Sequence, residues 1–157
     1  GYYFMGFDDI MEKYELEKIK TIGDSYMCAG GIPFPTKDHA VKMVQAGFEI
    51  LQFVEDAKLS NTHEGLSFDV RIGINTGPVV AGVVGSKKFS YDIWGDTVNV
   101  ASRMESMSEA GKINISENTY ELIKNEFNCV YRGEIAVKNR GKMKMYFVHK
   151  PGDKNLT

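Results

Sequence analysis

Apolar residues along the chain follow two different periods, one typical of helices and one typical of strands. Phe4, Phe7, Ile10 and Tyr14 recur at helical spacing, whereas the apolar residues of segment 68–74 alternate strictly with polar ones. The predicted helices cover residues 4–14, 38–57 and 116–127, and a further helix begins just after Gly95. The predicted strands cover residues 17–22, 25–29, 68–74, 79–84 and 112–115. A further strand ends at Gly95, and two more lie between residues 130 and 148.

The order of these elements indicates one domain of mixed class. Helices and strands are interleaved, and Gly23-Asp24 joins two of the strands in a hairpin. We therefore expect an α/β or α+β fold with an antiparallel component. A chain of 157 residues has the size of one domain. We place that domain at residues 1–150 and a tail at residues 151–157.

Segment Gly77–Gly85 is rich in glycine, a feature shared with phosphate-binding loops. A Walker loop needs Lys-Ser or Lys-Thr directly after its second glycine, and Val83-Val84 follow Gly82 here. We therefore expect a buried strand whose glycines allow another backbone to approach closely.

Composition excludes several classes of function. The net charge of −2 gives no general attraction for nucleic acid or an anionic membrane. Cys28 and Cys129 form no CxxC pair, and His39, His63 and His149 lack metal-ligand spacing, so we expect free core thiols and no zinc site. No apolar segment is long enough to span a membrane.

The stretch from Tyr91 to Arg103 carries the strongest chemical signal. An apolar strand ends at Gly95, and Asp96 or Thr97 stands where the N-cap of the next helix is expected. Asn99 and Arg103 lie four residues apart in that helix, so both side chains leave the same face. A neutral donor beside a fixed cation suits a polyanion whose charge builds during a reaction. The alternative is an ordinary solvated helix face.

Two parts of the sequence carry carboxylates that are candidate metal ligands. Lys20 and Asp24 flank the hairpin turn, and a carboxylate at such a tip is well placed to meet a divalent cation, although Asp24 alone also suits an ordinary turn. Asp8 and Asp9 lie inside the first predicted helix, where the helix dipole is a sufficient reason for acidic residues near the start.

Three long segments together resemble the catalytic domain of class III adenylate and guanylate cyclases. They are residues 17–27 (EKIKTIGDSYM), 71–85 (RIGINTGPVVAGVVG) and 91–105 (YDIWGDTVNVASRME), in the order that the family has them. The resemblance implies an α+β fold with a ferredoxin-like βαββαβ core and additional strands and helices. It also implies that the first strand and helix of that core are missing from this chain.

The resemblance assigns a role to each matching residue. Asp24 matches a metal-binding aspartate, and Asn99 and Arg103 match the pair that orients the ribose and stabilises the transition state. Lys20 and Asp92 match the two purine-reading positions, where Lys and Asp form the adenine-type pair and guanylate cyclases look like they use Glu and Cys.

Lys138 matches the lysine that meets the polyphosphate. Asn139 departs from the glycine that is more frequent in the family at its position, which leaves Arg140 as an alternative contact.

The implied activity is conversion of ATP to 3′,5′-cyclic AMP and pyrophosphate at a homodimer interface. Two Mg²⁺ or Mn²⁺ ions would assist in-line attack of the ribose 3′-hydroxyl on the α-phosphorus. We expect a cytoplasmic domain of a longer parent protein with an upstream regulatory or membrane domain.

One departure from the family pattern concerns the first metal-binding aspartate. Asp9 imitates it superficially, but only fifteen positions separate it from Asp24, and it is predicted to lie in a helix rather than a strand. We therefore expect this chain by itself to have little or no activity.

Three alternatives remain open at this level. The first is a catalytically inactive nucleotide-binding or dimerisation module, and the second is a guanylate cyclase, which Lys20 and Asp92 disfavour. A ferredoxin-like RNA binder is the least favoured, since the chain lacks a basic face.

Overall fold

The computed structural model describes residues 2–60, 68–85 and 90–153. Helices and strands are mixed along the chain, which confirms the α+β class. The helices are α1 (Tyr2–Lys13), α2 (His39–Ser60), α3 (Asp96–Ser106) and α4 (Glu117–Ile123), and the strands are β1 (Glu17–Ile22), β2 (Ser25–Ala29), β3 (Ile72–Ile74), β4 (Val80–Val84), β5 (Ser90–Trp94), β6 (Ile113–Ser116), β7 (Asn128–Val137) and β8 (Gly141–His149).

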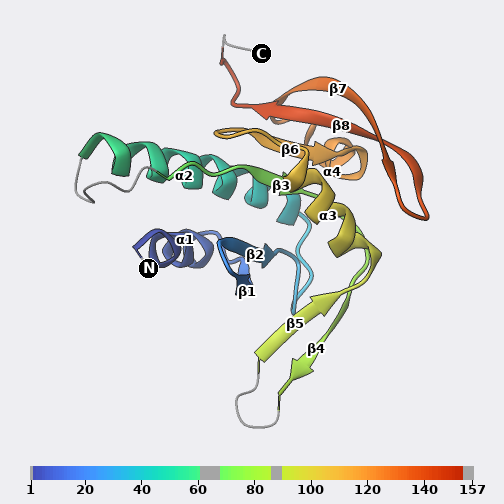
Figure 1. The fold of residues 1–157 in the computed structure, drawn as a ribbon, viewed down its shortest axis with the longest axis horizontal. Coiled ribbons are helices and arrows are strands. Elements are labelled where there is room, and N and C mark those ends of the chain that lie inside the picture. Colours follow the sequence, from blue (N-terminus) through green and yellow to red (C-terminus); the bar gives the residue numbers. More distant parts are fainter. Residues whose placement is uncertain (1, 61–67, 86–89, 154–157) are drawn as a thin grey trace.

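The described strands form three separate sheets. The largest has the order β3-β6-β8-β7, in which β3 and β6 are parallel and the other neighbours are antiparallel. Two antiparallel hairpins, β1-β2 and β4-β5, make up the rest. The β4-β5 ribbon extends away from the body of the domain, and β1-β2 lies between that ribbon and the two long helices (Figure 1).

Three apolar clusters hold these layers together. In the first, α1 packs on α2 through Phe7, Met11 and Val54. In the second, α2 covers the four-stranded sheet, where Val44 lies among the fully buried side chains of β6. In the third, Val100 and Met104 of α3, both completely buried, pack on residues of the β7-β8 hairpin. Helix α3 is therefore fixed to the sheet by its apolar face.

Most predicted elements are confirmed, and two are shorter than expected. The strand predicted over 68–74 is limited to Ile72–Ile74, because only these residues pair with β6. The helix predicted to reach residue 127 begins as expected at Ser116, whose hydroxyl accepts a hydrogen bond from the Thr119 amide, but it ends at Ile123.

The prediction that segment Gly77–Gly85 forms a buried strand is wrong. Strand β4 forms there, but Val80 is 56% exposed and Val83 is 63% exposed. The reason is tertiary: within the described chain β4 pairs only with β5, and the contacts that β1 and α3 make with this ribbon fall on β5. An apolar run predicts a strand without specifying what covers it.

The predicted N-cap of α3 is also wrong. Gly95 occupies the N-cap position with φ of 123°, a conformation that favours glycine, and no side chain caps the helix. Asp96 and Thr97 lie inside the first turn instead. Their side chains bind elsewhere, since Asp96 pairs with Arg140 and the Thr97 hydroxyl donates to the Pro78 carbonyl at 2.6 Å.

Helix α3 approaches β3 so closely that their backbones touch. A Cβ atom on Gly73 would lie only 1.9 Å from the amide nitrogen of Glu105. Arg71, just before β3, forms an ion pair with the Glu105 side chain across the same contact. Position 73 therefore sets how deeply α3 sits on the sheet.

We predict that Gly73→Ala lowers the free energy of unfolding by about 1–3 kcal/mol or more, because α3 must move away from β3. Urea denaturation monitored by circular dichroism measures this change. Gly47→Ala is the matched control: its Cβ would meet side chains alone, the nearest being the tip of Ile113 at 2.9 Å, and alanine favours the helix. An unfolding free energy that Gly73→Ala leaves equal to that of Gly47→Ala would contradict the close contact.

Candidate nucleotide site

A large cleft opens between the β1-β2 hairpin, helix α2, strand β3 and helix α3. Its volume is about 1270 Å³, and Lys20, Asp24 and Asn99 all line it. Its apolar side is contributed mainly by α1 and α2, from residues Phe7, Met11, Ala46, Gly47 and Ile50. An apolar wall with a few convergent polar groups is typical of a small-molecule site.

The structure brings Lys20 and Asp92 together from different hairpins. The Lys20 Nζ donates to Asp92 Oδ2 at 3.0 Å, although 72 positions separate the two residues in sequence. The second carboxylate oxygen accepts from the backbone amide of Ile93 at 2.8 Å. Both hydrogen bonds favour the ionised carboxylate and hold the pKa of Asp92 below its ordinary value. The pair therefore presents a fixed ammonium beside a fixed carboxylate.

Asn99 and Arg103 lie on the exposed side of α3, opposite the buried Val100 and Met104. Asn99 lines the cleft, whereas Arg103 is not among the lining residues. The Arg103 guanidinium makes one long hydrogen bond, from Nη2 to the Ala136 carbonyl at 3.4 Å. An exposed side chain with such a weak contact is available to bind an anion.

The turn between β7 and β8 lies against the start of α3. Arg140 in this turn forms an ion pair with Asp96 in the first turn of the helix. Lys138 is exposed in the same turn and does not line the cleft. The structure thus brings the predicted polyphosphate lysine to the same helix as Asn99, with Arg140 occupied by a carboxylate.

Asp24 is exposed at the tip of the β1-β2 hairpin and lines the cleft. In the described part of the chain, no three His, Cys, Asp or Glu side chains gather closely enough to hold a metal ion. Asp9 is exposed on α1, so it lies in a helix as predicted, and Asp8 accepts hydrogen bonds from Tyr26 and Lys18. Asp24 is therefore a single carboxylate and not a complete metal site.

Two asparagines that the sequence analysis passed over reach the backbone of α3. Asn75 donates to the Thr97 carbonyl at 3.0 Å, and Asn114 donates to the Met104 carbonyl at 2.9 Å. Asn114 was visible in the sequence as the polar residue between two isoleucines of an apolar strand. Such a residue needs a buried partner, but the sequence does not say which one.

Both cysteines are free thiols, as expected. Burial raises the pKa of Cys28 to about 12 and that of Cys129 to about 11. Neither thiol is therefore ionised near neutral pH, and neither is activated as a nucleophile.

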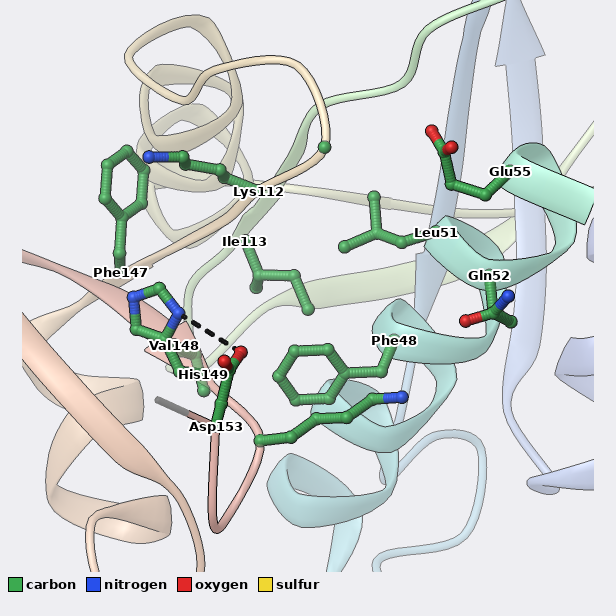
Figure 2. Close-up of a pocket in the computed structure, with 12 residues that line it drawn as sticks. Phe48, Leu51, Gln52, Glu55, Lys112, Ile113, Phe147, Val148, His149 and Asp153 are labelled. Carbon is green, nitrogen blue, oxygen red and sulfur yellow. Dashed lines mark ion pairs between the residues drawn. The ribbon is translucent and has the colours of Figure 1, made fainter. Parts of the chain in front are cut away.

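A second cavity of about 280 Å³ lies between α2 and the end of β8. Figure 2 shows Phe48 and Leu51 of α2 on one side and the His149 ring turned toward Asp153, with 3.9 Å between the paired atoms. None of the candidate site residues from the sequence lines this cavity, whereas Lys20, Asp24 and Asn99 line the large cleft.

Comparison with known proteins identifies the family. Residues 2–150 match the adenylate and guanylate cyclase catalytic domain. The chain is 41% identical to an adenylate cyclase of Mycobacterium tuberculosis over 145 residues, covering 92% of this chain and 32% of that protein. It is 43% identical to the guanylate cyclase soluble subunit beta-2 of Rattus norvegicus over 143 residues, covering 90% of this chain and 21% of that protein.

A solved structure supports the same assignment. The adenylyl cyclase CyaB from P. aeruginosa superposes with a TM-score of 0.88 and 33% identity, over 99% of this chain and 82% of that one. The chain therefore belongs to the class III nucleotidyl cyclases, and its relatives include both adenylate and guanylate cyclases. It spans about a third or less of the length of the curated relatives described above.

Among the described residues, no helix is both long and apolar enough to cross a membrane.

We predict that Lys20→Ala raises the pKa of Asp92 toward the ordinary value of about 3.9. Because the pKa of Asp92 is lowered in the folded state, the ion pair stabilises the fold at pH values above the ordinary pKa of the carboxyl. This contribution is lost as the pH falls through the folded-state pKa. A ¹³C carboxyl titration by NMR measures the shift. Lys18→Ala is the control on the same strand, because Lys18 pairs with Asp8 and should leave Asp92 unchanged. Equal titration curves in both variants would refute the pairing.

Proposed function

We propose that this domain is an adenylate-type cyclase that converts ATP to 3′,5′-cyclic AMP and pyrophosphate. The observation that carries the choice of base is the Lys20–Asp92 pair, with its 3.0 Å contact. The family relationship alone does not choose between ATP and GTP, because the relatives named above include both adenylate and guanylate cyclases at similar identity.

The argument for adenine rests on hydrogen-bond polarity. Adenine presents an acceptor at N1 and a donor at its exocyclic amine, which complement the Lys20 ammonium and the Asp92 carboxylate. Guanine presents a donor and an acceptor at the corresponding atoms and would face two mismatches. Buried mismatches of this kind are costly, so the pair favours ATP by both attraction and exclusion.

The remaining residues are assigned to the sugar and the phosphates. Asn99 holds the ribose, Arg103 meets the negative charge that grows on the α-phosphoryl oxygens, and Lys138 binds the polyphosphate. The ribose 3′-oxygen bonds to the α-phosphorus as the bond to the bridging oxygen breaks. Pyrophosphate leaves with the bonding electrons, and the hydroxyl proton passes to solvent.

Cyclases of this family generally use two divalent metal ions. Such ions take six or more oxygen ligands, several of them from the protein or the substrate phosphates. Asp24 is one exposed carboxylate, and the described residues offer no cluster to complete such a site. The residues present therefore do not fit the metal pair by themselves, and we derive no step through it.

The shape of the cleft supports the proposal that the ferredoxin-like core lacks a strand here. Strands β2 and β3 are both terminal strands of their sheets, and residues of both line the cleft. A strand between them would join the two sheets and cover the apolar residues of α1 and α2. It would also bring a further segment beside Asp24, where additional metal ligands are required.

Dimerisation is typical of cyclase domains, and we propose a symmetric homodimer. The exposed apolar side chains of the β4-β5 ribbon, Val80, Val83 and Trp94, support an interface there. In the proposed dimer, Asp24 of one protomer faces Asn99 and Arg103 of its partner. We also propose that the domain belongs to a longer parent protein with an upstream regulatory or membrane domain.

The direct test is an assay of the full-length gene product with ATP and Mn²⁺. We predict cyclic AMP and pyrophosphate in equal amounts, and a fall in kcat on the order of 100-fold or more in Arg103→Ala, because the charge on the phosphoryl oxygens loses its partner. Lys124→Ala removes an exposed cation that pairs with Glu121 away from the cleft, and it should keep full activity. Nucleotide binding without any cyclic product would favour an inactive module.

A second test addresses the base. We predict that the double variant Lys20→Glu with Asp92→Cys shifts the ratio of kcat/KM from ATP toward GTP by at least about tenfold, because the donor and acceptor pattern then matches guanine. Lys18→Glu, a charge reversal on the same strand, should leave the ratio unchanged. An unchanged ratio in the double variant would refute the assignment of the base-reading pair while leaving cyclase activity itself intact.

A further inference from the structure

Helix α3 carries Asn99 and Arg103, and its position depends on polar contacts as well as on its apolar face. Asn75, just after β3, donates from Nδ2 to the Thr97 carbonyl at 3.0 Å in the first turn. Asn114, in β6, donates from Nδ2 to the Met104 carbonyl at 2.9 Å near the other end. Each end of the helix is therefore held by one side-chain amide.

Both amides are themselves fixed by a second partner. Asn75 Oδ1 accepts from the Ser116 hydroxyl at 2.6 Å, and Asn114 Oδ1 accepts from Arg132 Nη1 at 3.0 Å. Asn114 and Ser116 are completely buried. Because each oxygen is occupied, each NH₂ group is directed at α3 and neither amide gains from rotating by 180°.

The hydrogen bond from Asn114 gives a partner to a backbone carbonyl at the C-terminal end of α3. The last four carbonyls of an α-helix have no partner within the helix, and Met104 lies among these residues. Arg132 Nη1 also donates to the Met107 carbonyl at 2.7 Å, just beyond the helix. The guanidinium in turn lies over the Phe147 ring, 3.8 Å from its centroid. The C-terminal end of α3 is thereby anchored to β6, β7 and β8.

We propose that Asn75 and Asn114 are positioning residues that set the rotation and depth of α3, and so aim Asn99 and Arg103 at the nucleotide. This inference rests on the function proposed above. Gly73 fixes the closest approach of α3 to β3, and the two amides prevent the helix from rolling about that contact. The proposed base-reading residues Lys20 and Asp92 lie on β1 and β5 and hydrogen-bond to each other, whereas the two amides donate to α3.

The test places Asn75→Asp and Asn114→Asp in the full-length gene product; both variants keep side-chain shape and the accepting oxygen but place an oxygen against the α3 carbonyl. We expect kcat to fall on the order of 10- to 100-fold, as for a small misplacement of reacting groups, with KM and the ATP-to-GTP ratio changed less than about twofold. Asn118→Asp is the matched control, since that amide donates at 3.2 Å to the carbonyl of Thr76 in a loop.

Hydrogen exchange measured by mass spectrometry separates aiming from general loss of folding. We expect faster exchange confined to α3, in its first turns for Asn75→Asp and in its last turns for Asn114→Asp, with far-UV circular dichroism unchanged. Unchanged exchange in α3 would overturn the proposal. So would a loss of activity that Asn118→Asp reproduces, or one that matches a loss of folded protein.

The two proposals fail in different ways. If the unsubstituted full-length gene product makes no cyclic nucleotide, the proposed function fails, and exchange in α3 still decides whether the amides hold the helix. If cyclic AMP forms normally in both Asp variants, the positioning role fails while the cyclase assignment stands.

Discussion

The contact between helix α3 and strand β3 is the constraint on which the rest of the structure depends. Gly73 allows the helix backbone to rest directly on the strand, and Val100 and Met104 fill the space on the β7-β8 side. Once the apolar face is committed in this way, the opposite face of the helix is directed toward solvent and the cleft. The exposure of Asn99 and Arg103 therefore follows from a packing requirement at a glycine.

The same arrangement separates two tasks within one small domain. The pair proposed to read the base lies on two hairpins, whereas the residues proposed to bind ribose and phosphate lie on α3 and on the turn after β7. This division agrees with a family whose members include both adenylate and guanylate cyclases while sharing one fold.

Two parts of the structure leave apolar surface uncovered. Strands β2 and β3 line a cleft that has an apolar side, and the β4-β5 ribbon exposes valines and a tryptophan. Exposed apolar surface of this kind favours association. Both features agree with the proposed additional strand and the proposed dimer.

Sequence by itself determined most of the element types, the mixed class and the cyclase family. Periodicity placed most helices and hairpins correctly because the spacing of side chains on a helix or strand is a local property. The same geometry predicted that Asn99 and Arg103 leave one side of their helix. Local pattern failed where long-range contacts decide the outcome. It placed Val80 and Val83 inside the domain, and it assigned the N-cap of α3 to a side chain.

Only the tertiary structure decided which distant residues meet. It joined Lys20 to Asp92 across 72 positions, and it directed Asn75 and Asn114 to the two ends of one helix. Hydrogen-bond polarity is visible in a sequence, but the partner of a polar group depends on how strands are ordered and helices are stacked. The order of the strands and the stacking of the helices follow from burial of the apolar surface of the whole chain, and no local segment carries that information.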